Sequence, residues 1–298
     1  MALLKPAPAE KNAQYPRLAR PDRHDRVLIV APHIDDEAIG AGGYAIDAVS
    51  SGAEVFVVFL TAGDCNRFAA RLLYKTLDPT ASNYLSVGKT RIAEAHEAME
   101  LLGIPPDHYY VLGYPDRGLR SMLDHPEAVV RSQATHAREV PYGDAMSPGS
   151  AYTLDNVLCD LKQVITAVDP TIVIAPVPFD LHEDHASAAE LTDLALDELG
   201  LRPKRLGYLV HMGRIATNLV NTPGRALLPP SRMRSFTWAT YPLSPQVQQL
   251  KTSILMTYRS QRPYVFLLRN AFVRRNELFY VYPDERATAA PARVLLAR

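Results

Sequence analysis

Two short polar clusters hold the residue types that could do chemistry in this sequence. The first follows the apolar run at residues 26–31 and reads HIDDE, with His33 placed three residues before Asp36. Acids in the first turn of a helix favour the helix dipole, and Asp35 suits an N-cap, so helix capping alone accounts for the carboxylates. Capping does not require His33, whereas a neutral imidazole and a carboxylate oxygen are both metal ligands. A metal site is therefore the alternative to a structural role.

The second cluster, PFDLHEDH at residues 178–185, places His182 and His185 on either side of Asp184. A pair of histidines that flanks an acid in a turn after a buried strand is unusual for a surface without function. Together with the first cluster it offers a set of two imidazoles and one carboxylate, His33, Asp36 and His185, which suits Zn²⁺ and leaves positions for water and substrate. Fe²⁺ or Co²⁺ could use the same ligands.

The elements that must position these clusters alternate between strands and helices. Continuous apolar runs of strand length are expected where both faces of a sheet are covered. Such alternation predicts a doubly wound, mostly parallel, Rossmann-like α/β sheet. In these sheets the ligand crevice lies beyond the carboxyl ends of the strands, where both polar clusters fall. The expected strands cover 26–31, 54–60, 109–112 and 171–175, and the expected helices cover 36–51, 89–102, 154–168 and 186–199.

We expect three regions along the chain. Residues 1–25, rich in proline and charge, predict a loose arm, and residues 26–205 predict the α/β catalytic core. From residue 206 the pattern changes to strands around one helix, which predicts a smaller β-rich extension packed on the core. The irregular excursions 63–88 and 116–150 are too long for routine connectors, so we expect them to decide the substrate.

Composition bounds the partners and the compartment. Lys plus Arg and Asp plus Glu both number 32, so nothing favours nucleic acid or an anionic membrane. Cys65 and Cys159 form no paired framework, no apolar segment approaches a membrane span, and the N-terminus lacks the core of a secretory signal. We therefore expect a soluble cytoplasmic protein, while its oligomeric state stays open.

Three glycines in the GAGG stretch after the first cluster raise the alternative of a nucleotide site. The spacing is not GxGxxG, and the acids before it would repel a phosphate. Because each glycine weakens a helix by about 0.8–1 kcal/mol relative to alanine, close approach to a neighbouring element is the better interpretation. The glycines are Gly40, Gly42 and Gly43.

PHIDDE with the later HEDH resembles the PIG-L/LmbE-like family of zinc-dependent N-acetylglucosaminyl deacetylases, whose pattern is (A/P)HPDDE with a later HxDH. Ile34 stands where the family usually has proline, which changes the stiffness of the loop rather than a ligand. The resemblance covers most of the chain, from about Arg26 to Tyr280. It continues at Gly63-Asp64, Arg91 with Glu94, Tyr114-Pro115-Asp116, and Lys251 with Ser260-Gln261.

The resemblance implies that His33, Asp36 and His185 bind the metal and that Asp35 is the general base. A bound Zn²⁺ brings the pKa of its water to about 7, and a nearby carboxylate can take the proton as the water attacks an amide carbonyl. His182, if Asp184 keeps it protonated, would stabilise the developing oxyanion. Asp184 could instead orient the imidazoles around the ion.

Two further positions match substrate contacts of the family. Arg91 could equally be an exposed arginine on an amphipathic helix, and Asp116 an ordinary turn aspartate. Glu37 is interpreted as a first-turn acid or a partner of the ligands, not as a ligand itself.

The resulting prediction is metal-dependent hydrolysis of the acetamide of an N-acetylated amino sugar or sugar conjugate, giving acetate and a free amine. One alternative is an amidase acting on a different sugar or thiol conjugate. A second is a nucleotide- or sugar-binding protein whose acids only cap helices, and a third is a family member that binds sugar without turnover.

Overall fold

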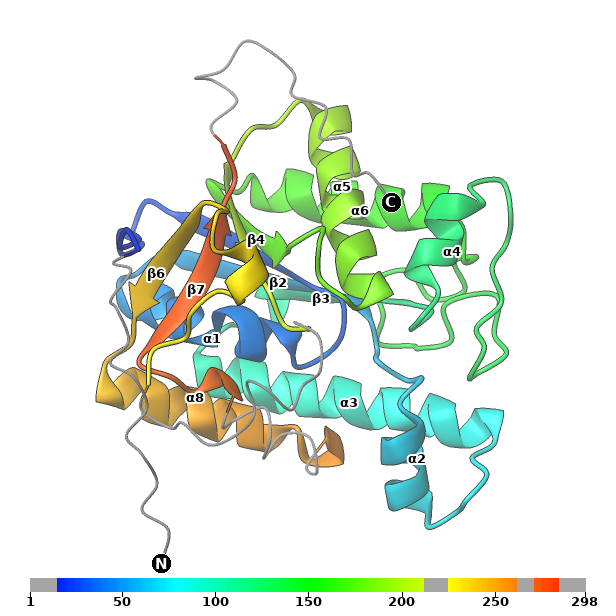
Figure 1. Ribbon diagram of the computed structural model, residues 1–298. Helices are drawn as coiled ribbons and strands as arrows, with labels where there is room; N and C mark the ends of the chain where they lie inside the picture. The colour runs from blue at the N-terminus through cyan, green and yellow to red at the C-terminus, as the bar shows by residue number, and fades with distance from the viewer. Residues whose placement is uncertain (1–14, 212–224, 262–270, 284–298) are drawn as a thin grey trace, which may run out of the picture.

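One seven-stranded sheet forms the centre of the protein (Figure 1). The computed structural model describes residues 15–211, 225–261 and 271–283. The strand order is β3-β2-β1-β4-β5-β7-β6. The strands are β1 (Arg26–Ala31), β2 (Glu54–Thr61), β3 (Tyr109–Tyr114), β4 (Ile172–Pro176), β5 (Lys204–Tyr208), β6 (Trp238–Pro242) and β7 (Asn276–Val281).

Strands β1 to β4 run parallel, as predicted, and β5, whose residues from 206 on were expected in the C-terminal extension, continues the parallel part. The apolar runs of β1, β2 and β4 are buried on both faces because helices cover both sides of the sheet. Strand β1 pairs with β2 on one side and with β4 on the other. The chain therefore adds strands β2 and β3 on one side of β1 and strands β4 and β5 on the other side. The α/β fold class is thereby confirmed, with a topological switch point beside β1.

Two layers of helices cover the sheet. Figure 1 shows α1, α3 and α8 on one face and α4, α5 and α6 on the other. Among the described residues, no helix has the length and apolar character needed to cross a membrane. The helices are α1 (Asp36–Ser50), α2 (Arg67–Tyr74), α3 (Ala81–Leu102), α4 (Leu119–Asp124), α5 (Leu154–Val168), α6 (Glu183–Leu199) and α8 (Pro245–Thr257).

The C-terminal strands continue the same sheet. Strand β7 pairs antiparallel with β5, and β6 pairs antiparallel with β7. The predicted division between residues 205 and 206 falls inside β5. Whether the part beyond it forms a separate unit stays a prediction.

Part of the expected N-terminal arm contacts the edge of the sheet, while residues 1–14 lie outside the described residues and the arm as a whole stays a prediction. Arg17 forms a parallel bridge with Thr240. The Leu18 N–H donates to the Thr240 carbonyl at 2.9 Å, and Thr240 N–H donates to the Pro16 carbonyl at 2.8 Å. The reason is that β6 is an edge strand, whose unpaired backbone groups accept a partner.

Two helices begin earlier than the apolar periodicity predicts. Helix α3 starts at Ala81, because Thr80 and Asn83 form a capping box that satisfies the first free N–H groups. Helix α6 starts at Glu183, because the His182 side chain accepts from the Asp184 N–H at 3.2 Å. The second polar cluster therefore includes the first turn of a helix.

Close packing explains Gly40 and Gly43 of α1, as predicted, whereas a Cβ at Gly42 would make only ordinary contacts. A Cβ at Gly40 would lie 2.4 Å from the Tyr208 ring on β5, and one at Gly43 would lie 2.5 Å from Leu243. Helix α1 thus lies close to the sheet and to the C-terminal elements.

Candidate metal centre and active site

The two polar clusters converge at the carboxyl ends of adjacent strands. His33 follows β1, and His185 lies in the first turn of α6 after β4. Their ring centroids are 5.4 Å apart. The two sequence-distant segments therefore meet at the switch point of the sheet, where ligands bind in open α/β folds.

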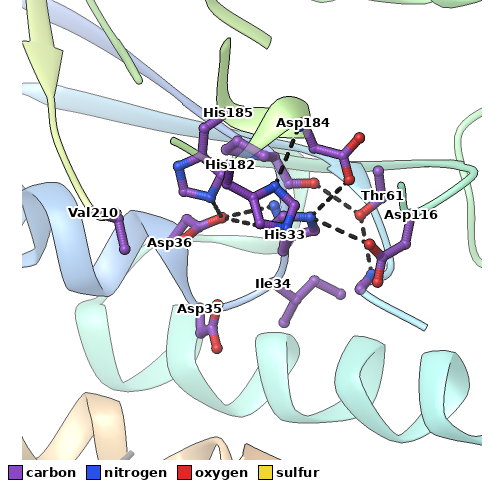
Figure 2. Close-up of polar contacts among 12 residues, drawn as sticks. His33, Ile34, Asp35, Asp36, Thr61, Asp116, His182, Asp184, His185 and Val210 are labelled. Atoms are coloured by element: carbon purple, nitrogen blue, oxygen red, sulfur yellow. Dashed lines mark hydrogen bonds and ion pairs between the residues drawn. The ribbon is translucent and has the colours of Figure 1, made fainter. Parts of the chain in front are cut away.

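One carboxylate oxygen lies between the two imidazoles. Asp36 Oδ2 is 3.1 Å from His33 Nδ1 and 3.1 Å from His185 Nε2 (Figure 2). Two ligands at the usual ~2.0–2.1 Å from Zn²⁺ in a tetrahedral site lie roughly 3.4 Å apart. The distance from the Asp36 oxygen to each of the two nitrogens is thus compatible with a pair of ligands on one ion.

A second observation indicates that these side chains suit a divalent cation. His185 is fully buried, yet neither ring nitrogen makes an aligned hydrogen bond with any described residue. Its Nε2 and Nδ1 face the oxygens of Asp36 and Asp180 at 3.1 and 3.3 Å instead. A buried nitrogen aimed beside a carboxylate rather than at it is expected where both groups face a third partner.

The remaining nitrogens of the two histidines also face carboxylates. His33 Nε2 lies 3.1 Å from Asp184 Oδ2, whose carboxylate also accepts from the Arg117 N–H at 2.6 Å. His185 Nδ1 lies 3.3 Å from Asp180 Oδ2. Carboxylates in this position fix the tautomer and orientation of a metal-binding imidazole.

Three groupings of side chains in this region have ligand atoms close enough to share an ion. They are His33 with His182 and His185, Asp180 with His185 and His211, and His33 with Asp116 and Asp184. The predicted set of His33, Asp36 and His185 is not one of these three groupings, although Asp36 Oδ2 lies 3.1 Å from a nitrogen of each histidine. The role of each of these residues as a ligand stays a prediction.

Opposite charges dominate the electrostatics of the cluster. Burial opposes the charged form of His185, but Asp36 and Asp180 outweigh it and raise its pKa to about 9. Burial is likewise outweighed at Asp36, where His185 and His33 hold the pKa well below its usual value. An ionised Asp36 is ready to bind a cation, which would displace the protons of the histidines.

Asp35 occupies the N-cap position of α1 but makes no capping hydrogen bond with its side chain. Its φ of +118° lies in a region that a residue with a Cβ rarely adopts, at a cost of about 1–3 kcal/mol. Burial raises the pKa of its carboxyl to about 7, although Arg91 opposes the shift. Figure 2 shows this carboxylate apart from the cluster around His33. The capping interpretation therefore does not explain Asp35.

Arg91 is buried, so the interpretation as an exposed surface arginine is wrong. Its Nη1 donates to the Gly63 carbonyl at 2.8 Å, and its Nη2 donates to the Ile34 carbonyl and lies 3.3 Å from Asp35 Oδ1. A Cβ at Gly63 would meet the guanidinium at 2.2 Å. Arg91 thus joins the loops after β1 and β2 and faces Asp35. Its contact with substrate stays a prediction.

Asp116 lies inside the site rather than in an ordinary surface turn. Its Oδ2 accepts from the Cys65 N–H at 2.8 Å, and its Oδ1 is 3.5 Å from His33 Nε2. Burial of Asp116 is outweighed by its contacts with His33 and Arg91, which hold its pKa below the usual range. A substrate contact here also stays a prediction.

The structure corrects the suggested relation between His182 and Asp184. The Asp184 carboxylate faces His33 and the N–H groups of Arg117 and Leu119. Burial, together with the nearby His33 and His185, lowers the pKa of His182 to about 4. His182 is therefore neutral near pH 7, and the Asp184 carboxylate faces His33 rather than His182; its role in orienting an imidazole stays a prediction.

Sequence reasoning missed two residues of the site. Asp180 accepts from the His182 N–H at 2.9 Å, from the Val210 N–H at 3.0 Å and from the His211 N–H at 3.1 Å. His211 follows β5 and places its ring 4.5 Å from that of His185. Both residues follow strands at the same sheet edge, which is the signal that could have identified them.

Comparison with known proteins agrees with this geometry. Residues 28–196 match the PIG-L family, described as GlcNAc-PI de-N-acetylase, over more than half of the chain. The chain belongs to the PIG-L family. The matched segment begins in β1, ends in α6 and includes both polar clusters.

Curated relatives of this PIG-L family member carry one shared name. The chain is 30% identical over 193 residues to a 1D-myo-inositol 2-acetamido-2-deoxy-alpha-D-glucopyranoside deacetylase of Kineococcus radiotolerans, covering 62% of this chain and 48% of the relative. It is 27% identical over 178 residues to the protein of that name in Corynebacterium glutamicum, covering 58% and 53% of the two chains. The chain thus spans about half the length of the curated relatives it matches.

Solved structures share the fold over nearly the whole chain. An N,N'-diacetylchitobiose deacetylase from Pyrococcus horikoshii aligns with TM-score 0.53 and 20% identity, covering 93% of this chain and 91% of its own. A 4-carboxy-2-hydroxymuconate hydratase from Pseudomonas putida aligns with TM-score 0.56 and 18% identity, covering 89% and 99%. Proteins named for different reactions share this scaffold, so function must be argued from the site.

Proposed function

We propose that this protein is a metal-dependent N-deacetylase that hydrolyses the acetamide of an N-acetylated amino sugar or sugar conjugate, giving acetate and a free amine. One observation carries the proposal. Asp36 Oδ2 lies 3.1 Å from both His33 and His185, while the adjacent Asp35 carboxylate is used neither in this cluster nor as a cap. Membership of the PIG-L family and the names of the relatives support the same reaction.

His33, Asp36 and His185 would hold the cation, for which we propose Zn²⁺, with Fe²⁺ or Co²⁺ as alternatives for the same donors. A bound divalent ion supplies Lewis-acid polarisation of the amide carbonyl and acidifies a water molecule. Asp184 and Asp180 hold the two imidazoles in position from the other side of each ring.

Asp35 is the proposed general base. Its buried carboxyl has a pKa raised to about 7, which suits a group that accepts a proton from water and returns it to the leaving amine. A cation beside it would favour the ionised form and lower that pKa. Arg91 faces Asp35 and would hold it in place during the transfer.

His182 is the proposed donor to the acetyl oxygen as negative charge develops there. Its Nδ1 accepts from the Asp184 N–H, so the neutral ring carries its proton on Nε2. A neutral imidazole N–H can donate a hydrogen bond to a developing oxyanion when it is held in place beforehand. We further propose that Asp116 accepts hydrogen bonds from sugar hydroxyls and that Arg91 bounds the same pocket.

A panel of N-acetylated sugars, including an inositol-linked acetamido sugar, tests the proposal by release of a primary amine. We expect release by the purified protein, its loss with chelator and its return with added Zn²⁺. His33→Ala and His185→Ala should each lose the metal by elemental analysis. Asp35→Asn should keep the metal and lose at least about a hundredfold in turnover, because a general base contributes roughly 10²–10⁴-fold.

Three results would count against the reaction or its assigned groups. Amine release that a chelator does not reduce would contradict the role of the cation in the reaction. Full turnover by Asp35→Asn would contradict the assignment of Asp35 as the general base. Absence of amine release across the panel, together with bound metal, would direct attention to another amide, such as a thiol conjugate.

A further inference from the structure

The backbone of Asp35 has an unfavourable conformation that the surrounding structure must hold. A residue with φ near +118° relaxes unless its neighbours fix it, since the conformation costs about 1–3 kcal/mol. Arg91 lies 3.3 Å from the Asp35 carboxylate and donates to the carbonyl of Ile34. The Asp35 carbonyl accepts from the Ile39 N–H at 3.0 Å, so the Asp35 N–H is the backbone group that still needs a partner.

A two-step chain of hydrogen bonds holds the Asp35 backbone. The Asp35 N–H donates to Glu37 Oε2 at 3.2 Å, and the Tyr258 hydroxyl donates to Glu37 Oε1. Glu37 and Tyr258 are both buried, with exposed fractions of 1% and 0%. Neither hydrogen bond therefore competes with solvent, and the Glu37 carboxylate has both oxygens engaged.

The end of α8 is itself fixed against α3. Glu94 accepts from the Ser260 N–H at 2.7 Å and from the Ser260 hydroxyl at 2.6 Å. Glu94 lies one turn after Arg91 on α3, so the helix that contacts the Asp35 carboxylate also locates Tyr258. Side chain and backbone of Asp35 are thus held relative to one helix.

We propose that Tyr258 is a positioning residue for Asp35, acting through Glu37. This inference rests on the proposed function, in which Asp35 is the general base. The Tyr258 hydroxyl donates to Glu37, so its connection to the Asp35 backbone runs through the Glu37 carboxyl group. Loss of its hydroxyl would leave Glu37 and then the Asp35 backbone free to move, and a base misplaced by 1 Å can cost about 10²-fold in rate.

A second tyrosine provides a matched control. The Tyr241 hydroxyl donates to Asp47 Oδ2 at 2.8 Å and also joins a C-terminal element to α1. Asp47 lies near the far end of α1 from Asp35. Tyr241→Phe therefore removes a part-buried hydrogen bond between a tyrosine and a carboxylate of α1 without touching the base.

Steady-state kinetics and amide hydrogen exchange of the metal-loaded protein test the proposal. Tyr258→Phe should lower kcat about tenfold with KM and metal content unchanged, and the Asp35 amide should exchange faster. Tyr241→Phe should leave kcat and the Asp35 amide as in the wild type. Glu37→Gln, which keeps only one acceptor oxygen, should reproduce the Tyr258→Phe loss, and the double variant should lose little more because both act in one chain.

An unchanged kcat in Tyr258→Phe, or equal losses in Tyr258→Phe and Tyr241→Phe, would overturn the positioning role. An Asp35 amide that exchanges at the wild-type rate in both Tyr258→Phe and Glu37→Gln would overturn it without reference to activity. Failure of the proposed function is a separate result, since the wild type would then release no amine. The exchange measurement would still decide whether Tyr258 holds the Asp35 backbone.

Discussion

Asp180 Oδ2 lies 3.3 Å from Nδ1 of His185, on the side of the ring that faces away from Asp36. The same carboxylate accepts from backbone N–H groups of the segments after β4 and β5. Burial of Asp180 is outweighed by its contacts with His185 and His211, which hold its pKa well below the usual range. One ionised carboxylate thus joins two loops and fixes one imidazole.

Asp180→Asn should weaken metal binding by about 10–100-fold, because the outer partner of a ligating histidine sets its orientation and basicity. A competition titration with a chelator of known affinity measures the change. Asp160→Asn is the matched control, since Asp160 is a buried carboxylate that accepts from Tyr114 and Ser147 hydroxyls at 2.8 Å. Equal metal affinity in the two variants would show that Asp180 does not act on His185.

The buried ion pair of Lys251 and Glu277 contacts the backbone of one turn of α1. Lys251 Nζ donates to Glu277 Oε1 at 2.6 Å and to the Ile39 carbonyl at 2.9 Å, while Glu277 Oε1 accepts from the Gly43 N–H at 2.6 Å. Ile39 and Gly43 supply the acceptor and donor of a single turn of the helix. Both charged side chains are buried.

Lys251→Met should lower the free energy of unfolding by about 3–5 kcal/mol, because it leaves the Glu277 charge buried without its partner. Urea denaturation followed by circular dichroism measures this loss. Lys162→Met removes a 2.6 Å pair with Glu198 whose side chains are partly exposed, and should cost much less stability because solvent screens the pair. Similar losses in the two variants would show that burial of the Lys251–Glu277 pair does not explain its contribution to the free energy of unfolding.

The sequence predicted the parts of the fold that depend on local pattern. Apolar runs predicted the positions of β1, β2 and β4. The rule that ligands bind at the carboxyl ends of parallel strands predicted that His33 and His185 lie in one site. The start of α3 was missed because Thr80 and Asn83 cap it ahead of its apolar stripe.

Contacts between distant segments could not be predicted in the same way. Tyr258 and Glu37 lie 221 residues apart, and no periodicity links a tyrosine at the end of α8 with a first-turn acid of α1. The role of Asp184 depended on which ring its carboxylate faces, and the spacing HEDH is compatible with either. Side-chain direction, set by packing of α6 against the sheet, decided it.

Asp64 should make stability depend on pH. Burial raises the pKa of its carboxyl from 3.8 to about 7, with Asp116 adding to the shift and the Tyr142 hydroxyl opposing it. Below the pKa that Asp64 has in the unfolded chain, the carboxyl is neutral in both the folded and the unfolded state. Its contribution to the free energy of unfolding is then fully present. As pH rises towards 7 the unfolded chain ionises first, so this contribution is lost.

The stability difference between wild type and Asp64→Asn isolates this effect from other titrating groups. Asparagine stays neutral, so the wild type should lose stability relative to the variant between about pH 4 and pH 7, by on the order of a few kcal/mol. Chemical denaturation at a series of pH values measures the difference. Parallel stability curves over that range would contradict a raised pKa at Asp64.

Gly40→Ala should destabilise the protein even though alanine favours helices. In an exposed helix this change adds about 0.8–1 kcal/mol, but here the new Cβ would lie 2.4 Å from the Tyr208 ring. Tyr208 cannot move freely, since it is buried and its hydroxyl donates to the Val30 carbonyl at 3.0 Å. Overpacking of this kind costs about 1–3 kcal/mol, so the clash should exceed the gain in helix propensity.

Relief of that clash requires α1 to move away from β5, and α1 carries Asp36 in its first turn. We therefore expect Gly40→Ala to lower both the melting temperature and the affinity for metal. Gly143→Ala is the control, because no atom lies within 4 Å of its added Cβ, and it should be neutral or slightly stabilising. A Gly40→Ala protein as stable as Gly143→Ala, with unchanged metal affinity, would mean that the close approach of α1 to Tyr208 does not hold the metal-binding carboxylate in place.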